Sequence, residues 1–291
     1  MKLQIENLTK TYPNGVKAMD AISLQIGIGM FGLLGPNGAG KSSLMRTLAT
    51  LQLPDKGARD FNGLNVLQNP MELRKQLGYL PQDFGVYPKQ SARKLLDYFA
   101  LLKGISSKKE RDESIEYVLE LTNLTEVQKK NVSEYSGGLK QRFGIAQLLL
   151  NKPKLIIVDE PTAGLDPEER HRFLNVLRAV GSEHIVLFST HIVEDVTDLC
   201  TDLAIMDKGK VLKSSTPKRA IEALNGTIWS KTIATRELGD YQSDYDIISS
   251  HYTENNQLVI RVFSKVQPDA TFKTSNPNLE DVYFVTLNHT V

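Results

Sequence analysis

The sequence predicts an α/β protein with a mostly parallel core sheet, a small N-terminal antiparallel β part, an inserted helical subdomain and a small C-terminal α+β domain. Three short apolar runs have the composition of strands that are buried on both faces. These runs are Met30–Leu34, Leu155–Val158 and Ile185–Phe188. Helix-like stretches follow them at Ser42 to Leu51, Pro167 to Val180 and Ile192 to Leu199. Alternation of strand and helix is typical of βαβ units and therefore favours a parallel sheet.

The remaining elements follow from their hydrophobic periodicity. The first forty residues alternate apolar and polar side chains, which predicts half-buried strands of a small antiparallel sheet. The apolar positions are Leu3, Ile5, Leu8, Ile22, Leu24, Ile26 and Ile28. A further strand is expected at Leu203–Met206. From about residue 85 to 150 helical periodicity dominates, and the clearest helices are expected at Ser91 to Lys103 and Lys108 to Leu121.

The pattern changes again near Asn225-Gly226. Strand-like pieces at Thr227 to Ile233 and Gln257 to Phe263 are separated by polar turns. A final helix is expected to place Leu279, Val282, Tyr283 and Leu287 on one face. We therefore predict one domain over residues 1–224, with the helical subdomain at about 85–150, and a small accessory domain over residues 225–291.

Composition limits the classes of function. The chain has 291 residues, of which 41% are hydrophobic and 24% charged, and its formal net charge is +1. This balance excludes a protein that binds nucleic acid through its overall charge, although a local basic patch stays open. The single cysteine, Cys200, excludes an intrachain disulfide and a cysteine-based zinc site. Met1–Asn7 has no apolar signal region, and no window approaches the roughly 18 apolar residues of a membrane span, so the chain by itself is not expected to cross a membrane.

A phosphate-binding loop follows the first buried run. Its residues match the pattern G-x-x-x-x-G-K-[ST] in full: Gly35, Pro36, Asn37, Gly38, Ala39, Gly40, Lys41 and Ser42. Glycines let backbone N–H groups turn toward phosphate oxygens, and the following helix, which includes Ser43, adds its positive dipole end. Lys41 supplies a charge to the β- and γ-phosphates, and the Ser42 hydroxyl is a ligand for Mg²⁺. A plain glycine-rich turn is the alternative, and the strand–loop–helix context disfavours it.

Two carboxylates follow the second buried run. Asp159 ends a strand where ligands bind in open α/β sheets, so it is expected to bind Mg²⁺ through a metal-bound water. Glu160 is one residue further and is expected to polarise an attacking water. The alternative is that both simply cap the next helix.

A second anion site is predicted at Ser136-Gly137-Gly138, which precedes the helix-like run Leu139 to Leu150. Serine and glycines at a helix start provide backbone donors, a hydroxyl and the helix dipole. The alternative is a flexible loop in which Ser136 serves only as the helix cap.

In combination, these motifs resemble the nucleotide-binding subunit of an ATP-binding cassette (ABC) transporter. The resemblance covers about residues 1–220 and depends on six motifs in the right order. They are Tyr12, the phosphate loop, Leu80-Pro81-Gln82, Tyr135-Ser136-Gly137-Gly138-Leu139, the strand ending in Asp159-Glu160, and Ser189-Thr190-His191.

The resemblance implies ATP and Mg²⁺ as cofactors and assigns the remaining roles. Tyr12 is expected to stack on adenine, Gln82 to sense Mg²⁺ and the γ-phosphate, and His191 to contact the γ-phosphate and Glu160. Gln82, Ser42 and Asp159 form the expected metal site. Ala163-Gly164-Leu165-Asp166 resembles the loop that crosses the dimer interface, where the family more often has Ser-Ala-Leu-Asp. Tyr135 and Leu139 replace the outer residues of the family's Leu-Ser-Gly-Gly-Gln signature.

The resemblance also implies an assembly. Two such chains pack head to tail, and each ATP lies between one phosphate loop and Ser136, Gly137 and Gly138 of the second chain. A homodimer is expected, with Asp166 at its interface, working with integral membrane permease subunits that carry a small-molecule, lipid or ion cargo. The expected location is cytoplasmic, peripheral on the inner face of the cell membrane.

Two segments resemble the exporter branch of the family, Asp83–Pro88 and Asn278–Phe284. The first belongs to the stretch Asp83–Ser91, where the family docks its permeases. The apolar residues there, Phe84, Val86, Tyr87 and Pro88, suit such a contact or, alternatively, a buried hinge. Homodimer contact, regulation of hydrolysis, permease docking and structural capping all remain open for residues 225–291.

A soluble ABC-type ATPase that acts on nucleic acid or ribosomes is the alternative function. It usually has two cassettes or a long coiled-coil insertion, whereas only about ninety-five residues separate Lys41 from Ser136 here. We therefore expect no nucleic-acid partner. A non-hydrolysing regulatory cassette is disfavoured because Lys41, Asp159, Glu160 and His191 are all present.

Overall fold

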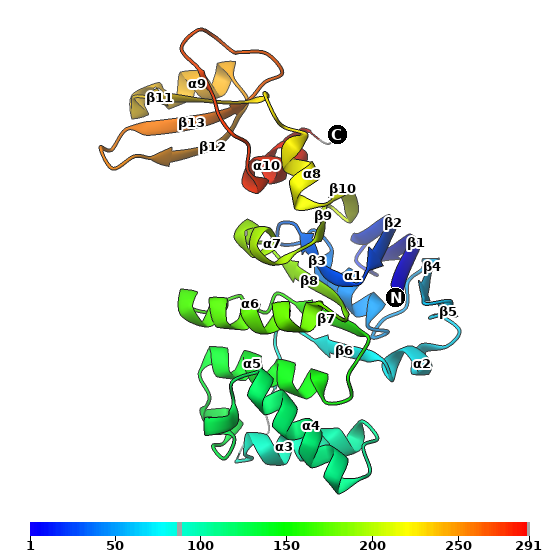
Figure 1. The fold of residues 1–291 in the computed structure, drawn as a ribbon. Coiled ribbons are helices and arrows are strands. Elements are labelled where there is room, and N and C mark those ends of the chain that lie inside the picture. Colours follow the sequence, from blue (N-terminus) through cyan, green and yellow to red (C-terminus); the bar gives the residue numbers. More distant parts are fainter. Residues whose placement is uncertain (86–88, 290–291) are drawn as a thin grey trace. The chain divides into compact units, whose positions relative to one another are not determined.

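The computed structural model describes residues 1–85 and 89–289 and divides into two compact units, Met1–Val211 and Leu212–Val291 (Figure 1). The predicted domain boundary after residue 224 falls inside the second unit. The reason is that α8 (Pro217–Glu222), which precedes this boundary, contacts α10 (Leu279–His289). Val86, Tyr87 and Pro88, which we considered as an apolar contact, lie outside the described residues.

A six-stranded sheet forms the core of the first unit, in the order β10-β9-β3-β8-β7-β6. Its strands are β3 (Gly29–Leu34), β6 (Leu77–Leu80), β7 (Leu155–Asp159), β8 (Ile185–Thr190), β9 (Asp202–Asp207) and β10 (Lys210–Ser215), the last containing the boundary between the units. β3 pairs in parallel with β8 and β9, and β7 pairs in parallel with β6 and β8. The predicted parallel core is thus confirmed, and β6 and β10 are strands that the sequence did not predict.

A second, antiparallel sheet has the order β2-β1-β4-β5. Its strands are β1 (Lys2–Thr11), β2 (Lys17–Gly27), β4 (Lys56–Phe61) and β5 (Leu64–Asn65). The pairing of Leu3 with Ile26 and of Ile5 with Leu24 places the alternating apolar residues on one face. Six of the predicted apolar residues belong to one core cluster with Leu44 of α1, so this face closes the core: Leu3, Ile5, Leu8, Ile22, Leu24 and Ile26. The prediction was wrong for Ile28, which follows the last residue of β2 and is 51% exposed.

The helices of the first unit form two groups. Around the core sheet are α1 (Lys41–Leu48), α2 (Pro70–Arg74), α6 (Pro167–Gly181) and α7 (Val193–Leu199). The predicted helical subdomain contains α3 (Ala92–Leu102), α4 (Lys108–Leu121) and α5 (Gly137–Leu149), with 3-10 turns at Thr125–Val127 and Val132–Glu134. In Figure 1 the helices α3, α4 and α5 are drawn below β6, at the edge of the core sheet. Of these helices, α5 contacts both β6 and α6. The subdomain is thereby joined to the core sheet.

The only cysteine of the chain is buried beside β3. Cys200 follows α7, and a Cβ added at Gly32 would lie 2.9 Å from the Cys200 Sγ. Burial raises the pKa of this thiol well above its usual value, and the nearby carboxylates of Asp195 and Asp202 add to the effect. Cys200 is therefore held as a neutral core residue.

The second unit is an antiparallel sheet with helices, in the strand order β12-β13-β11-β14. Its strands are β11 (Ile228–Ile233), β12 (Ile247–Tyr252), β13 (Leu258–Phe263) and β14 (Lys273–Thr274). Its helices are α8, the 3-10 turn Thr235–Glu237, α9 (Leu238–Asp244) and α10. An ion pair of 2.6 Å between Arg261 of β13 and Asp281 of α10 holds the final helix to the sheet. The α+β character matches the prediction, and β12 is an addition.

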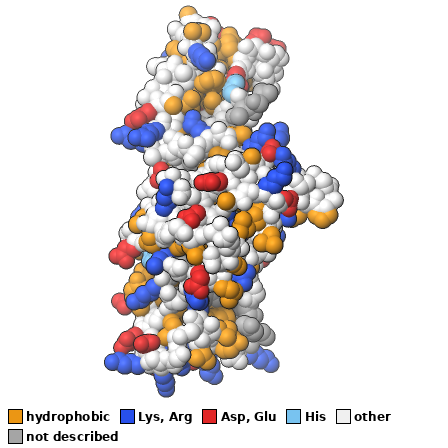
Figure 2. Space-filling view, turned by 90° about the vertical axis from the view of Figure 1, so that its right-hand side faces the viewer, with side chains coloured by type: hydrophobic (Ala, Val, Ile, Leu, Met, Phe, Trp, Pro, Cys, Tyr) orange, Lys and Arg blue, Asp and Glu red, His pale blue; other side chains and the backbone are white. Residues whose placement is uncertain are grey.

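The described surface is mixed in charge. On the face that Figure 2 shows, Lys and Arg side chains are interspersed with Asp and Glu side chains. Across residues 1–85 and 89–289, no helix combines the length and the apolar character that a bilayer crossing requires.

Candidate functional site

The loop between β3 and α1 can be built only with glycine at two of its positions. A Cβ at Gly35 would lie 2.3 Å from the Met206 carbonyl oxygen. Gly40, the residue before α1, has a φ of +101°, and its Cβ would lie 2.1 Å from the Ala18 carbonyl oxygen. Neither position can accept a side chain, because backbone from β9 and β2 approaches too closely. The loop is therefore clamped between both sheets.

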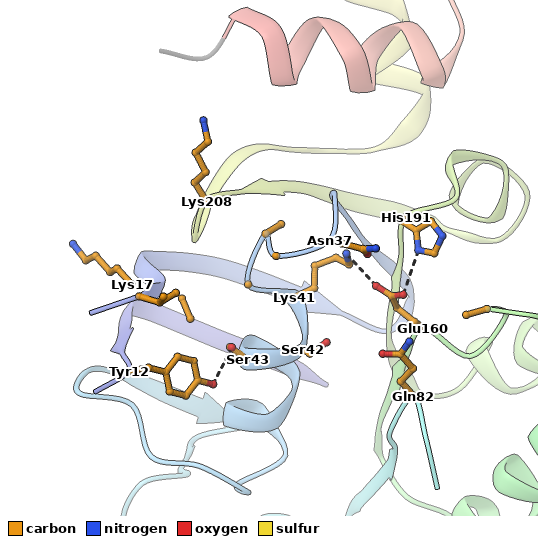
Figure 3. A pocket seen from close by; sticks show the side chains of 16 residues that line it. Tyr12, Lys17, Asn37, Lys41, Ser42, Ser43, Gln82, Glu160, His191 and Lys208 are labelled. Carbon is orange, nitrogen blue, oxygen red and sulfur yellow. Dashed lines mark hydrogen bonds and ion pairs between the residues drawn. The ribbon is translucent and has the colours of Figure 1, made fainter. Parts of the chain in front are cut away.

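Lys41 extends from the start of α1 back across this loop, and it is only 4% exposed. Its Nζ donates to the carbonyl oxygens of Gly35 at 2.7 Å and Pro36 at 3.1 Å. It also lies 3.1 Å from Oε1 of Glu160 (Figure 3). A buried ammonium needs such partners, but neutral carbonyls bind it more weakly than an anionic oxygen does. The arrangement is suited to exchange these carbonyls for phosphate.

Asp159 is the last residue of β7 and is buried. Its Oδ1 accepts from Ser42 Oγ at 3.3 Å and from Ser189 Oγ at 2.6 Å. A hydroxyl and a carboxylate side by side are the hard oxygen donors that Mg²⁺ requires, so the residues present fit this ion. Ser189 also accepts from the Glu160 backbone N–H at 3.0 Å, which connects the ends of β7 and β8.

Glu160 is held at both carboxylate oxygens and is 9% exposed. Lys41 Nζ lies near Oε1, and the Nδ1 of His191 lies 3.2 Å from Oε2 (Figure 3). The Glu160 backbone has a φ of +44°, in the left-handed region that non-glycine residues rarely adopt. Such a conformation costs about 1–3 kcal/mol and persists only where the surrounding structure enforces it. The structure thus directs this carboxylate toward the loop and the histidine.

Tyr12 lies at the opposite end of the site. Its hydroxyl lies 3.0 Å from Ser43 Oγ and donates to Gln52 Oε1 at 3.0 Å, so two residues of the α1 region fix the ring. Figure 3 shows Tyr12 beside the start of α1, with Lys41, Glu160 and His191 on the far side of the loop.

One cavity of about 780 Å³ connects these groups. Its lining residues are Tyr12, Val16, Lys17, Ala18, Asn37, Gly38, Ala39, Gly40, Lys41, Ser42, Ser43, Gln82, Glu160, Ala163, His191 and Lys208. Most of the predicted nucleotide-site residues are therefore brought together. Sequence reasoning missed Lys17 and Lys208, which lie in a strand and a turn with no motif around them. It also missed Gln52, the partner of Tyr12.

The remaining predicted residues do not line this cavity. Asp159 is buried beneath it, and Gly35 and Pro36 take part through the carbonyl oxygens that bind Lys41. Ser136 caps α5, where its Oγ accepts from the Leu139 N–H at 3.3 Å. Ser136, Gly137 and Gly138 are thus on the helical subdomain, outside the lining of the phosphate-loop cavity.

Asp166 is likewise engaged in its own helix. It caps α6, and its Oδ1 accepts from the Glu169 N–H at 2.9 Å. Tyr135 points into the helical subdomain, where its hydroxyl donates to the Val127 carbonyl at 2.8 Å and burial raises its pKa to about 12. Tyrosine at this signature position is therefore a core residue.

Comparison with known proteins identifies the family. The family model described as ABC transporter matches residues 19–163. Three relatives from Bacillus subtilis (strain 168) align with most of the chain. The uncharacterised ABC transporter ATP-binding protein YxlF is 38% identical over 72% of this chain and 69% of its own length. The linearmycin resistance ATP-binding protein LnrL is 33% identical over 80% and 75%. The uncharacterised ABC transporter ATP-binding protein YhaQ is 33% identical over 97% of both chains.

Solved structures agree with this result. The ATP-binding subunit of an ABC transporter is 26% identical and superposes with a TM-score of 0.68, covering 77% of this chain and 93% of that one. A dimeric ATP-binding cassette in a post-hydrolysis state, bound to ADP and Pi, is 23% identical with a TM-score of 0.67 over 74% and 98%, and shows the fold alone. The chain therefore belongs to the ABC transporter family, as an ATP-binding cassette that hydrolyses ATP.

Proposed function

We propose that this cassette pairs with a second copy of itself and drives export of a cargo through separate membrane subunits. The observation that carries the chemical step of this proposal is the position of Glu160, which is held between Lys41 and His191 at the wall of the phosphate-loop cavity. A carboxylate fixed in this way beside a lysine and a histidine is suited to activate water for phosphoryl transfer.

The nucleotide would lie along the cavity between its two ends. The Tyr12 ring, fixed by Ser43 and Gln52, provides a surface on which adenine can stack. At the other end Lys41 would exchange the Gly35 and Pro36 carbonyls for β- and γ-phosphate oxygens.

The metal site would use Ser42, Asp159 and Gln82. Of these, Ser42 binds Asp159 directly, and Gln82 lines the cavity near Glu160 (Figure 3). Bound Mg²⁺ would neutralise charge on the β- and γ-phosphates.

Glu160 would act as the base once Lys41 turns to phosphate. This leaves Oε1 free to accept a proton from the attacking water, while His191 stays on Oε2 and holds the carboxylate in place. The strained backbone of Glu160 supports this role, because strain of this kind concentrates at active sites.

The proposed pairing is supported by three predicted site residues that do not line the cavity. Ser136, Gly137 and Gly138 present a helix N-terminus, which favours anions, but they do not line the phosphate-loop cavity of their own chain. In a head-to-tail pair they would reach the γ-phosphate of the second chain, with Asp166 at the interface. Because ATP contacts both halves only in the pair, binding shifts the equilibrium toward it.

Export is supported by the relatives rather than by the cavity. LnrL is named for linearmycin resistance, and the segments Asp83–Pro88 and Asn278–Phe284 resemble the exporter branch. The proposed cargo is a small molecule, lipid or ion carried by permease subunits that dock near Asp83–Ser91. The chain would then work in the cytoplasm, on the inner face of the membrane.

Glu160→Gln tests the proposal. The variant keeps the size of the side chain but cannot accept a proton, so phosphate release should fall roughly 10²–10⁴-fold. ATP binding should persist, and the variant should accumulate as a dimer in size-exclusion chromatography with ATP. Glu168→Gln is the matched control, because Glu168 is exposed on α6 and, among the residues that the structure describes, pairs with Arg172 alone. Fast hydrolysis by Glu160→Gln would remove the base assignment.

A further inference from the structure

Asp195 is a buried carboxylate that the proposed chemistry does not use. It lies in the first turn of α7, four residues after His191, and its side chain is 0% exposed. It is not among the residues that line the cavity. We propose that Asp195 is a positioning residue that fixes His191 and Glu160 relative to each other. This inference rests on the proposed roles of those two residues.

The first connection leads to His191 through Thr190. Asp195 Oδ2 accepts from the Thr190 hydroxyl at 3.2 Å. The same hydroxyl accepts from the Ile192 backbone N–H at 3.0 Å. Thr190 and Ile192 are the two neighbours of His191 in the chain, so a single hydroxyl oriented by Asp195 fixes the backbone on both sides of the histidine.

The second connection leads to Glu160 through Thr162. Asp195 Oδ2 also accepts from the Thr162 hydroxyl at 2.8 Å, and Thr162 is buried. Thr162 is two residues after Glu160, in the turn where the Ala163 N–H donates to the Glu160 carbonyl at 3.3 Å. One carboxylate oxygen therefore joins the segment that leaves Glu160 to the segment that ends at His191.

A carboxylate is the group that this position requires. Both threonine hydroxyls donate to Oδ2, and the Arg170 Nε donates to Oδ1 at 2.6 Å. Asp195 thus receives three donors and offers none, as only an ionised carboxylate can. Arg170 also compensates the buried negative charge, which would otherwise be costly. An amide in this place would turn a donor toward either Arg170 or the threonines.

The consequence concerns the contact of 3.2 Å between His191 Nδ1 and Glu160 Oε2. His191 is partly exposed, and within the described residues its side chain pairs with Glu160. Its direction is therefore set by its backbone, which Thr190 and Asp195 hold. A shift of about 1 Å in a catalytic group can cost about 100-fold in rate, so small changes at Asp195 should reach the chemistry.

The first experiment compares Asp195→Asn with Asp198→Asn, an exposed position on the same helix. In steady-state ATPase assays Asp195→Asn should lower kcat by about 10- to 100-fold. The KM for ATP should change less than about twofold, because Asp195 does not contact the cavity. Asp198→Asn should retain the wild-type kcat. A wild-type kcat for Asp195→Asn, or a loss expressed only in KM, overturns the inference.

A double-mutant cycle separates positioning from simple anchoring of α7. In a His191→Ala background, Asp195→Asn should lower kcat by less than about threefold, because the group that it positions is gone. A residue that only stabilises α7 would cost the same factor in both backgrounds. Equal factors would therefore contradict the inference.

Thr190→Val provides the same test with a smaller change, should Asp195→Asn fail to fold. Valine keeps the shape of threonine but removes the hydroxyl that links Asp195 to His191. Its loss of kcat should likewise shrink in the His191→Ala background. Glu160→Gln measured in parallel separates the two proposals. If Glu160→Gln is inactive and Asp195→Asn is fully active, only the positioning role fails, whereas an active Glu160→Gln removes the proposed function beneath it.

Discussion

The two units bury charge in different ways. In the first unit, the buried charged residues Lys41, Asp159 and Glu160 lie together where β3 and β7 end, whereas Arg59 and Arg142 are buried elsewhere. In the described part of the second unit, Asp281 is the one buried residue among the Asp, Glu, Lys and Arg residues, at 1% exposure. It accepts from Arg261 at 2.8 and 2.6 Å and from the Asn278 N–H at 2.8 Å.

The difference concerns how well each charge is satisfied by its own chain. Arg261 and Asp281 form a bidentate pair, the strongest geometry for such groups, and Asn278 adds a further donor. Lys41 instead shares its ammonium among two neutral carbonyls and Glu160. A charged group whose hydrogen bonds are all satisfied by its own chain, such as Asp281, has a structural role. A charged group beside a cavity that is bound mainly by neutral carbonyls, such as Lys41, can exchange them for a ligand.

Among changes to these buried charge pairs of Lys41 and Arg261, the largest effect is expected from Lys41→Met. Removing the charge takes away the group proposed to stabilise the transferring phosphate, so ATP hydrolysis should fall by roughly 10²–10³-fold or more. The second unit should unfold as in the wild type. Phosphate-release assays check the first outcome, and Lys94→Met, an exposed position on α3, is the control. Substantial hydrolysis by Lys41→Met would contradict the conclusion that the Lys41 charge is available to the nucleotide.

A smaller effect, confined to the other unit, is expected from Asp281→Ala. The change leaves Arg261 partly buried and without its carboxylate, which should destabilise the second unit by about 2–4 kcal/mol. Trp229 of β11, the only tryptophan in the chain, reports this unit selectively, so urea unfolding followed by its fluorescence measures the loss. Nucleotide binding by the first unit should persist. Asp244→Ala, at an exposed position of α9, should leave the midpoint unchanged.

The smallest effect, and one of opposite sign, is expected at Arg59 of β4. Its side chain is 2% exposed, and within residues 1–85 and 89–289 its Nε and Nη1 have no hydrogen-bond partner. Arg59→Met should therefore stabilise the first unit by about 1 kcal/mol, because an uncompensated buried charge is replaced by an apolar chain. Thermal unfolding checks this, with exposed Lys56→Met as the control. A lower melting temperature would show that Arg59 is better satisfied than its contacts indicate.

Burial of Arg59 also makes the stability of the first unit depend on pH. Burial lowers the pKa of Arg59 to about 10, so the unfolded chain holds this proton more tightly than the folded one does. The penalty is fully present at neutral pH and decreases as the pH rises above about 10. The wild type and Arg59→Met should therefore approach each other in stability at alkaline pH.

The elements that could be predicted are those whose burial produces a regular pattern of apolar residues in the sequence. β7 and β8 are continuous apolar runs because parallel strands in the core are covered on both faces. Six strands in the described part of the chain were not predicted, and β4, β6 and β12 are examples among them; the others are β5, β10 and β14. β6 is only four residues long and contains Gly78, and β4 and β12 carry mostly polar or exposed side chains. Their pairing is determined by neighbouring strands rather than by their own composition.

The candidate site was predictable where its chemistry is local in sequence. The phosphate loop and Asp159-Glu160 each have a compact motif, and the structure places Glu160 beside Lys41. Asp195 was not predicted, because its hydrogen bond to Thr162 joins residues 33 positions apart, and no sequence motif contains both of them. Lys17 and Lys208 reach the cavity only because β2 and the turn after β9 fold against the loop.

The burial of Cys200 makes the chain convenient for spectroscopy. A thiol that is enclosed beside β3 and held protonated reacts slowly with maleimides or nitroxide reagents, since the thiolate is the reactive form. A cysteine introduced at an exposed position such as Glu113 of α4 would therefore be the one readily labelled thiol, with the native residue left in place. Distances between two such labels could then follow the proposed pairing of chains through a cycle of ATP addition and hydrolysis.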